Sequence, residues 1–159
     1  MRLYFLRHGL ANRNAWDGED YLRPLTSKGV KRMRREASTI KRLGLNLSAL
    51  RTSPLTRARQ TAELVAEALM MQEDLIVDDR LTPGFGRAAL QNIARDHSPD
   101  DHVMLVGHEP DFSLTVEALI GGGTITFKKG GLARVDIPHP GRLEGELVWL
   151  IPPKVLALG

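Results

Sequence analysis

Two histidines, His8 and His108, stand about a hundred residues apart, each where a short apolar run ends. His8 follows the run 3–6 and Arg7, and His108 follows the run 103–107. Continuous apolar runs of this length are typical of buried parallel strands. Ligands of open α/β sheets bind outside the carboxyl ends of such strands, so both imidazoles can face one crevice. Because Arg7 favours an anion in that crevice, the three residues together indicate phosphoryl chemistry.

The composition predicts an ordinary globular protein. With 159 residues the chain is long enough for one complete core, and we expect a single domain over residues 1–159. No apolar run approaches the roughly 20 residues that span a bilayer, and the opening 1–6 is too short for a signal peptide. The absence of cysteine excludes disulfides and thiol chemistry. We therefore expect a cytoplasmic protein without a membrane partner.

The segment 28–42 carries much of the positive charge, although the net charge is only +3. A basic run can bind nucleic acid or an acidic protein surface, but the exposed face of a helix explains it as well. No aromatic residue alternates with these charges, so we do not expect nucleic acid as a partner. The role of the segment stays open at this point.

Hydrophobic periodicity predicts strands and helices in alternation. We expect a first helix from Thr26 or Ser27 to Gly44. A second helix should follow Ser53, with Ser53 as its cap and Pro54 as its first residue. A weak helix is expected over 87–97, and a further one from Pro110 to Gly121. Strands are expected at the first run and over 47–52, 75–77, 102–107, 124–127, 132–137 and 147–151. This order predicts a three-layer α/β/α sandwich whose mostly parallel central sheet carries an antiparallel addition.

Four stretches of the chain match, in order, the pattern of one family. The LRHG stretch 6–9 resembles the signature of the histidine phosphatase superfamily, which includes the cofactor-dependent phosphoglycerate mutases. Asn14 stands where many members have an asparagine. The stretch 53–62 is similar to the Ser-Pro…Arg-Ala…Gln-Thr block of the family, and the stretch 106–108 resembles the motif of its second catalytic histidine. The short chain, with 81–83 and 128–131, is most similar to the SixA-type phosphohistidine phosphatases. The resemblance implies a phosphoglycerate mutase-like fold.

The resemblance also implies roles for four residues. His8 is expected to attack phosphorus as a neutral imidazole, and an unperturbed histidine with a pKa near ~6.5 is largely neutral at pH 7. His108 is expected to donate a hydrogen bond to the phosphoryl group. Arg7 and Arg57 offer planar, permanently charged forks for its oxygens. Phosphoryl transfer passes through a loose transition state, so its catalysis needs mainly positioning and charge stabilisation.

Three further residues are expected to contribute to substrate binding: Asn14, Gly9 and Ser53. Asparagine is also common in polar loops for structural reasons, so Asn14 has an ordinary alternative explanation. Arg51 and Arg59 lie close enough in sequence to take the place assigned to Arg57. We expect no metal and no cofactor, because adjacent arginines repel a cation and no carboxylate completes a ligand set.

Two positions depart from the family pattern. Many relatives have an acidic residue where Leu10 stands, and a glutamate where Arg80 stands, so a general acid is not visible at either place. Asp78, Asp79 and Glu109 are near in sequence, but sequence alone does not place them in the pocket. Because a phosphoramidate needs less proton donation than an alkyl ester, the pattern favours metal-independent hydrolysis of a phosphohistidine protein through a phosphohistidine enzyme intermediate.

Two other functions remain open. One is a phosphatase for a small phosphomonoester, which would need its own proton donor. The other is a non-catalytic module that binds phosphate or a polyanion. The pair His8 and His108 argues against a pure binding module, because such a module needs cationic donors but no nucleophile.

Overall fold

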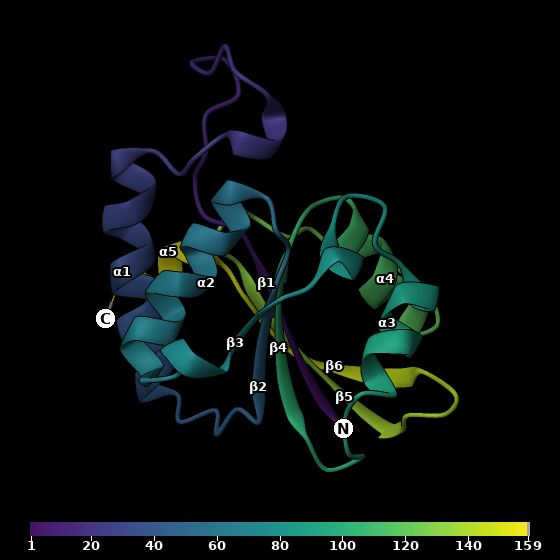
Figure 1. Cartoon of the computed structure of the whole chain (residues 1–159). Coiled ribbons are helices and arrows are strands. Elements are labelled where there is room, and N and C mark those ends of the chain that lie inside the picture. The colour runs from purple at the N-terminus through teal and green to yellow at the C-terminus, as the bar shows by residue number, and fades with distance from the viewer. Residues whose placement is uncertain (159) are drawn as a thin grey trace.

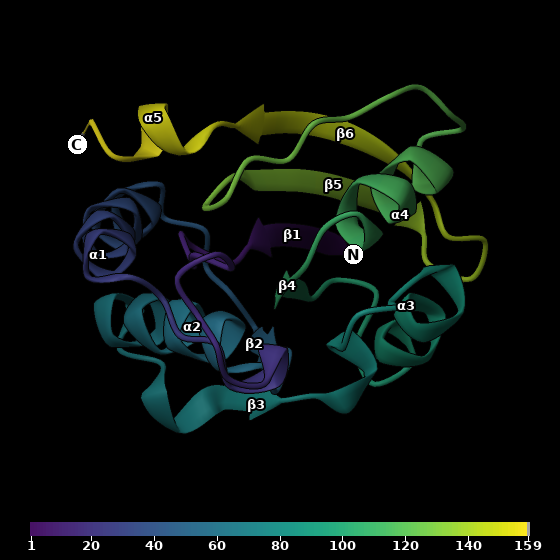
Figure 2. The same cartoon turned by 90° about the horizontal axis from the view of Figure 1, so that it is seen from above.

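A computed structural model describes residues 1–158, in which a six-stranded sheet lies between two layers of helices (Figure 1). The strands are β1 (Arg2–Arg7), β2 (Ala49–Thr52), β3 (Leu75–Val77), β4 (His102–Gly107), β5 (Leu132–His139) and β6 (Glu144–Ile151). Their order across the sheet is β3-β2-β4-β1-β5-β6, as Figure 2 shows from above. The first four in this order are parallel, and β5 and β6 add antiparallel pairs. The predicted fold class is confirmed.

The helices divide between the two faces of the sheet. They are α1 (Ser27–Arg42), α2 (Thr56–Leu69), α3 (Arg87–Ala94), α4 (Asp111–Leu119) and α5 (Pro153–Leu156), with short 3₁₀ helices η1 (Asp20–Leu22), η2 (Gln72–Asp74) and η3 (Asp79–Leu81). In Figures 1 and 2, α1, α2 and α5 cover one face, and α3 and α4 cover the other. Each layer therefore closes its own hydrophobic core against the sheet.

Strand β1 supplies both cores, because successive side chains of a strand point to opposite faces. Leu3 and Phe5 pack into the core under α3 and α4, whereas Tyr4 and Leu6 pack into the core under α1 and α2. Its parallel partner β4 ends in register with it, with Arg7 opposite Gly107. The residues that follow the two strands thus emerge next to each other at the carboxyl edge of the sheet.

The predicted start of the second long helix is wrong. Helix α2 begins at Thr56 after Leu55, so Ser53 is not its cap and Pro54 is not its first residue. Instead, the backbone N–H of Ser53 donates to the carbonyl of Val106 (3.0 Å), which continues the strand pairing by one residue. This pairing holds Ser53 at the carboxyl edge of the sheet, three residues before the first residue of the helix.

The predicted strand over 124–127 is also wrong, since this segment has no strand structure. The N–H of Ile125 donates to the side chain of Glu117 (2.7 Å) and the carbonyl of Phe127 accepts from Arg7, so the segment pairs with side chains. The other expected elements are present with small changes at their ends: the helix expected over 87–97 ends at Ala94, and the last strand begins at Glu144.

Helix α1 explains the basic segment 28–42. Its first turn is capped by Thr26, whose hydroxyl accepts from the N–H of Gly29 (2.9 Å), and its apolar residues face the sheet. Basic residues such as Lys31, Arg34 and Arg35 are exposed on the outer side. Within residues 1–158, no helix combines the length and the apolar character needed to cross a membrane.

Candidate active site

A pocket of about 330 Å³ lies beyond the carboxyl ends of β1 and β4. It is lined by Arg7, His8, Arg13, Asp20, Arg23, Arg57, Pro83, His108, Glu109 and Lys129. The structure therefore brings together the two histidines and the two arginines that the sequence singles out. The loop 10–24, which carries η1, rises above this edge of the sheet at the top of Figure 1.

The imidazole of His8 is held in one tautomer. Its Nδ1 lies 2.7 Å from the carbonyl oxygen of Gly9, which can only accept, so Nδ1 carries the hydrogen. The N–H of Arg57 Nε points to His8 Nε2 at 3.3 Å, which agrees with a free lone pair on that atom. His8 is buried, with 5% of its surface exposed. A neutral imidazole with an accessible Nε2 lone pair is what attack on phosphorus requires.

The surroundings of His8 keep it neutral. Burial lowers its pKa well below the ordinary value of 6.5, because the charged form would be poorly solvated. The nearby His108, Arg57 and Arg7 lower the pKa further, and only the Gly9 carbonyl opposes this shift. The lone pair on Nε2 is therefore available at neutral pH.

His108 faces His8 across the pocket, with ring centroids 5.4 Å apart. Its Nε2 lies 2.8 Å from the hydroxyl oxygen of Ser53, while its Nδ1 is buried without a partner. If the Ser53 hydroxyl donates to Nε2, Nδ1 carries the hydrogen and can donate to a bound oxyanion. Burial, followed by the charge of Arg57, lowers the pKa of His108 to about 4, so this ring is neutral as well.

Arg7 is positioned by the segment that the sequence assigned to a strand. Its Nη1 donates to the carbonyl of Phe127 (2.7 Å), and its buried Nε has no partner in this structure. The N–H of Gly130 donates to the carbonyls of both Arg7 and His8 (3.1 Å each). Gly130 has a φ of +87°, and a Cβ there would contact the carboxylate of Glu36, so only glycine fits. Segment 127–131 therefore orients both residues.

Arg57 already has a carboxylate partner from the loop above it. Its Nη2 lies 3.2 Å from Asp20 Oδ2, and its Nη1 donates to the backbone carbonyl of Asp20 (2.8 Å). Arg23 holds the same carboxylate through Nε (3.0 Å). Asp20 is half exposed, so a phosphoryl group entering from solvent can replace it on Arg57.

The pocket as a whole is cationic. Five of its residues carry positive charge, against two carboxyl groups: Arg7, Arg13, Arg23, Arg57 and Lys129 against Asp20 and Glu109. The crowding is strong enough that burial and neighbouring positive charges lower the pKa of Lys129. A multiply charged oxyanion is the ligand that relieves this repulsion best.

The other predicted site residues lie in different places. Asn14 is exposed in the loop and does not line the pocket. Gly9 lies behind His8, where its N–H donates to the hydroxyl of Thr61 (3.0 Å). Ser53 contacts the site through His108.

The two alternatives to Arg57 are engaged elsewhere. Arg51 pairs with Asp78 (2.8 Å), and Arg59 pairs with Glu63 (3.2 Å). The carboxyl groups that the sequence left unplaced are now located. Asp78 lies in that ion pair, and Asp79 is exposed on η3.

Several pocket residues had no recognisable signal in the sequence. Asp20, Arg23 and Arg13 come from the irregular loop 10–24, whose conformation no periodicity predicts. Glu109 was named only as a neighbour of His108, and the structure places it in the pocket wall. In residues 1–158, no group of three or more His, Asp or Glu side chains is arranged to hold a metal ion.

This fold and this pocket define the class of protein. The sequence model of the histidine phosphatase superfamily (branch 1) matches residues 3–84, and the chain belongs to that family. An uncharacterized protein of Picosynechococcus is 37% identical, with 98% of this chain and 99% of that protein covered. The match to the family model confirms the family that the motifs indicate.

Two further comparisons concern the subgroup. Phosphohistidine phosphatase SixA of Escherichia coli is 29% identical, with 96% of this chain and 94% of that protein covered. The solved structure of the protein histidine phosphatase SixA complexed with tungstate superposes with a TM-score of 0.82, at 28% identity and with 97% and 98% of the two chains covered. The chain is thus SixA-like, and this likeness supports phosphatase activity.

Proposed function

We propose that this protein removes the phosphoryl group from a phosphohistidine side chain of another protein, through a transient phosphohistidine on His8. The observation that carries the proposal is the fixed tautomer of His8 in the pocket. Nδ1 of His8 is committed to Gly9, so Nε2 is the atom that can attack. The likeness to SixA supports the substrate class.

The proposed reaction has two steps. Arg7, Arg57 and His108 hold the phosphoryl oxygens, which displaces Asp20 from Arg57. His8 Nε2 then forms a bond to phosphorus while the bond to the leaving imidazole breaks, and that imidazole takes up a proton, which the attacking water of the second step replaces. A water molecule next attacks phosphorus, the bond to His8 breaks, and inorganic phosphate leaves. Both transfers are in line, so positioning and positive charge supply most of the catalysis.

We also propose that the reaction needs no divalent metal. The pocket already has five positively charged side chains, which can compensate the charge that Mg²⁺ compensates in other phosphoryl-transfer sites. Activity is expected to be unchanged in excess chelator, measured as phosphate release after dialysis against it. Loss of activity that a divalent ion restores would contradict this part of the proposal.

A phosphatase for a small phosphomonoester is the second candidate. Glu109 in the pocket wall favours it, because a carboxyl group can protonate a poor leaving group such as a sugar alkoxide. The third candidate, a non-catalytic binding module, needs only the positively charged side chains. It does not account for the His8 lone pair.

Substrate profiling separates these candidates. We expect a protein phosphorylated on histidine to be dephosphorylated with a higher kcat/KM than any member of a panel of small phosphate esters. The His8→Ala variant is the matched control and is expected to show no turnover of either class. A small ester with the higher kcat/KM would favour the second candidate. Phosphate binding by the wild type without any turnover would favour the binding module.

A further inference from the structure

Two carboxyl groups line the candidate active site, Asp20 and Glu109, and their surroundings differ. Asp20 accepts from Arg23 Nε (3.0 Å) and pairs with Arg57 Nη2 (3.2 Å). Partial burial would raise the pKa of Asp20, but Arg23 and Arg57 together lower it. Asp20 is therefore an ionised carboxylate and a poor proton donor at neutral pH.

Glu109, unlike Asp20, has no cationic side chain of residues 1–158 hydrogen-bonded to its carboxyl group. Its Oε1 is buried without a hydrogen-bond partner, and its Oε2 contacts the neutral hydroxyl of Ser113. Burial raises the pKa of Glu109, and this effect outweighs the hydrogen bond from Ser113 and the charge of Arg7. The carboxylate of Asp111 on α4 raises it further. A carboxyl group with one unpaired buried oxygen is stabilised in its protonated form.

The position of Glu109 suits a proton donor. It directly follows His108 and lines the same pocket as His8. Ser113, in the first turn of α4, fixes one of its oxygens, so the side chain is oriented by a helix and not by a flexible loop. The nucleophile, the cations and a carboxyl group whose pKa burial raises are thus gathered around one space.

We propose that Glu109 is the general acid of this site, which donates its proton to the leaving group as His8 attacks phosphorus. This inference rests on the proposed phosphatase function. In the first step the bond from phosphorus to the leaving atom breaks, and that atom takes the Glu109 proton. In the second step the attacking water gives a proton to the Glu109 carboxylate while the bond between His8 and phosphorus breaks. Each turnover therefore restores the protonated acid.

The assignment explains how the pocket works without the acidic residues that many relatives have at the positions of Leu10 and Arg80. Leu10 does not line the pocket, and Arg80 is tied to Asp78 and Asp96 outside it. Glu109 approaches from a different strand end. With Glu109 as the acid, the substrate class includes phosphate compounds whose leaving group needs a proton on departure. Examples of such leaving groups are the imidazole nitrogen of a phosphohistidine and an alkoxide oxygen.

The test compares the wild type with Glu109→Gln across aryl and alkyl phosphates of increasing leaving-group pKa. The wild type is expected to show a shallow dependence of kcat/KM on leaving-group pKa. The variant is expected to lose about 10²- to 10⁴-fold on alkyl phosphates and little on para-nitrophenyl phosphate. Retained turnover of the latter shows that the variant is folded. Asp79→Asn, which removes an exposed carboxylate outside the pocket lining, is the control and should keep the shallow dependence.

The pH profile is a second readout. Wild-type kcat on alkyl phosphates should fall on the alkaline side as Glu109 loses its proton, and this limb should be absent in Glu109→Gln. Ser113→Ala removes a hydrogen bond that lowers the Glu109 pKa, so it should move the limb to higher pH.

If kcat/KM depends equally on leaving-group pKa in an active wild type and in Glu109→Gln, the assignment of Glu109 as the general acid is overturned. The proposed phosphatase function would still stand. A wild type that turns over no phosphate ester or phosphohistidine, and shows no phosphate on His8 after trapping without acid, would overturn the proposed function itself.

Discussion

The strand pair β1 and β4 has a hollow at each end, and the two hollows contain similar residue types. At the carboxyl end lie Arg7, His8 and His108 in the candidate active site. At the amino end, Arg2 and His102 stand opposite each other in the register and line a slightly larger hollow of about 380 Å³. The presence of an arginine and a histidine, and the volume, therefore do not distinguish the two ends.

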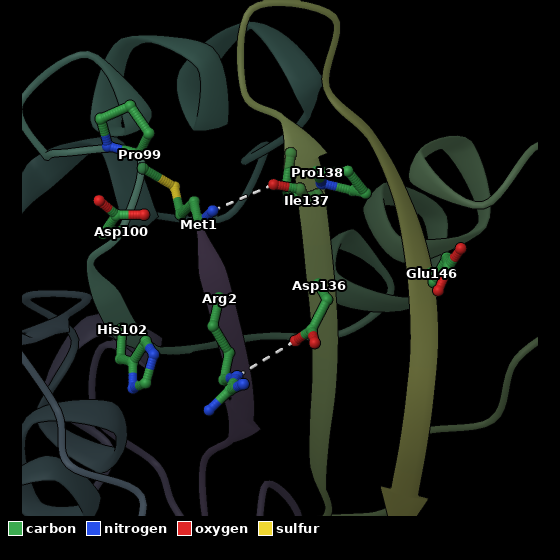
Figure 3. Close-up of a pocket in the computed structure, with 9 residues that line it drawn as sticks. All are labelled: Met1, Arg2, Pro99, Asp100, His102, Asp136, Ile137, Pro138 and Glu146. Carbon is green, nitrogen blue, oxygen red and sulfur yellow. Dashed lines mark hydrogen bonds and ion pairs between the residues drawn. The ribbon is translucent and has the colours of Figure 1, made fainter.

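The amino-end hollow differs in how its polar groups are paired. Arg2 pairs with Asp136 (3.3 Å), and the terminal amine of Met1 donates to the carbonyl of Ile137. Dashed lines in Figure 3 mark both interactions. His102 Nδ1 contacts the carbonyl of Leu45 (3.2 Å). Three carboxylates line this hollow, namely Asp100, Asp136 and Glu146, so it repels an anion.

At the carboxyl end, by contrast, polar atoms are buried and left without partners. Arg7 Nε and His108 Nδ1 have none, and the His8 lone pair meets only Arg57 at 3.3 Å. The comparison teaches that unsatisfied donors and excess positive charge mark the candidate site. A bound oxyanion would satisfy both, which is the arrangement expected of a preorganised phosphoryl site.

The largest expected effect that separates the two ends is the loss of the nucleophile. His8→Ala should lower kcat by about 10⁴-fold or more, because nothing else in the pocket can form the covalent intermediate. His102→Ala should leave kcat unchanged. Phosphate release and circular dichroism of both variants measure activity and folding. Substantial turnover by a folded His8→Ala protein would contradict the mechanism.

The next effect concerns the arginines. Arg57→Ala should lower kcat/KM by about 10²- to 10³-fold, since it removes a preorganised donor from the transferring phosphoryl group. Arg2→Ala at the amino end removes a cation that is already paired with Asp136, and kcat/KM should not change. Similar losses in both variants would mean that net charge, and not position, matters.

A smaller effect is expected from the carboxylates. Asp20→Asn should lower KM about two- to fivefold, because Asp20 competes with the substrate for Arg57 and partly exposed ion pairs are worth less than about 1 kcal/mol. Asp136→Asn is the matched change at the other end and should leave KM unaltered. An increased KM in Asp20→Asn would show that Asp20 positions Arg57 more than it competes with substrate.

The smallest effect is expected from mild acidification. Protonation of His8 would remove the attacking lone pair, but burial keeps its pKa well below 6.5. As pH falls from 7 through 6.5, kcat/KM should therefore stay level once the ionisation of the substrate phosphate is taken into account. The measurement is kcat/KM of an aryl phosphate against pH. An acidic limb centred at 6.5 would indicate a solvated histidine as the nucleophile.

Local patterns in the sequence predict much of this architecture. The apolar runs before His8 and His108 define β1 and β4, and the parallel pairing of such strands brings their carboxyl ends together. The helical period between Thr26 or Ser27 and Gly44 predicts α1, and the structure identifies Thr26 as its cap. These features depend on short-range spacing and on side-chain chemistry, so the sequence alone is enough to predict them.

The misplaced elements have one physical cause. Ser53 has the chemistry of a helix cap, but its N–H pairs with Val106 and its hydroxyl with His108, both more than fifty residues away. The run 124–127 alternates like a strand, yet its groups pair with Glu117 and Arg7. Local propensity cannot predict such partners, because they are side chains and backbone groups of other elements, which only the folded chain brings next to these segments.

The sequence by itself thus determined the fold class and the four residues that meet in the pocket. Only the tertiary structure decided their chemical states: the His8 tautomer through Gly9, the neutral histidines through burial, and the contrast between Asp20 and Glu109. A residue's identity says which protons and charges it can carry. The dielectric surroundings and the partners that shift its pKa are properties of the folded chain, so they exist only when distant segments are packed together.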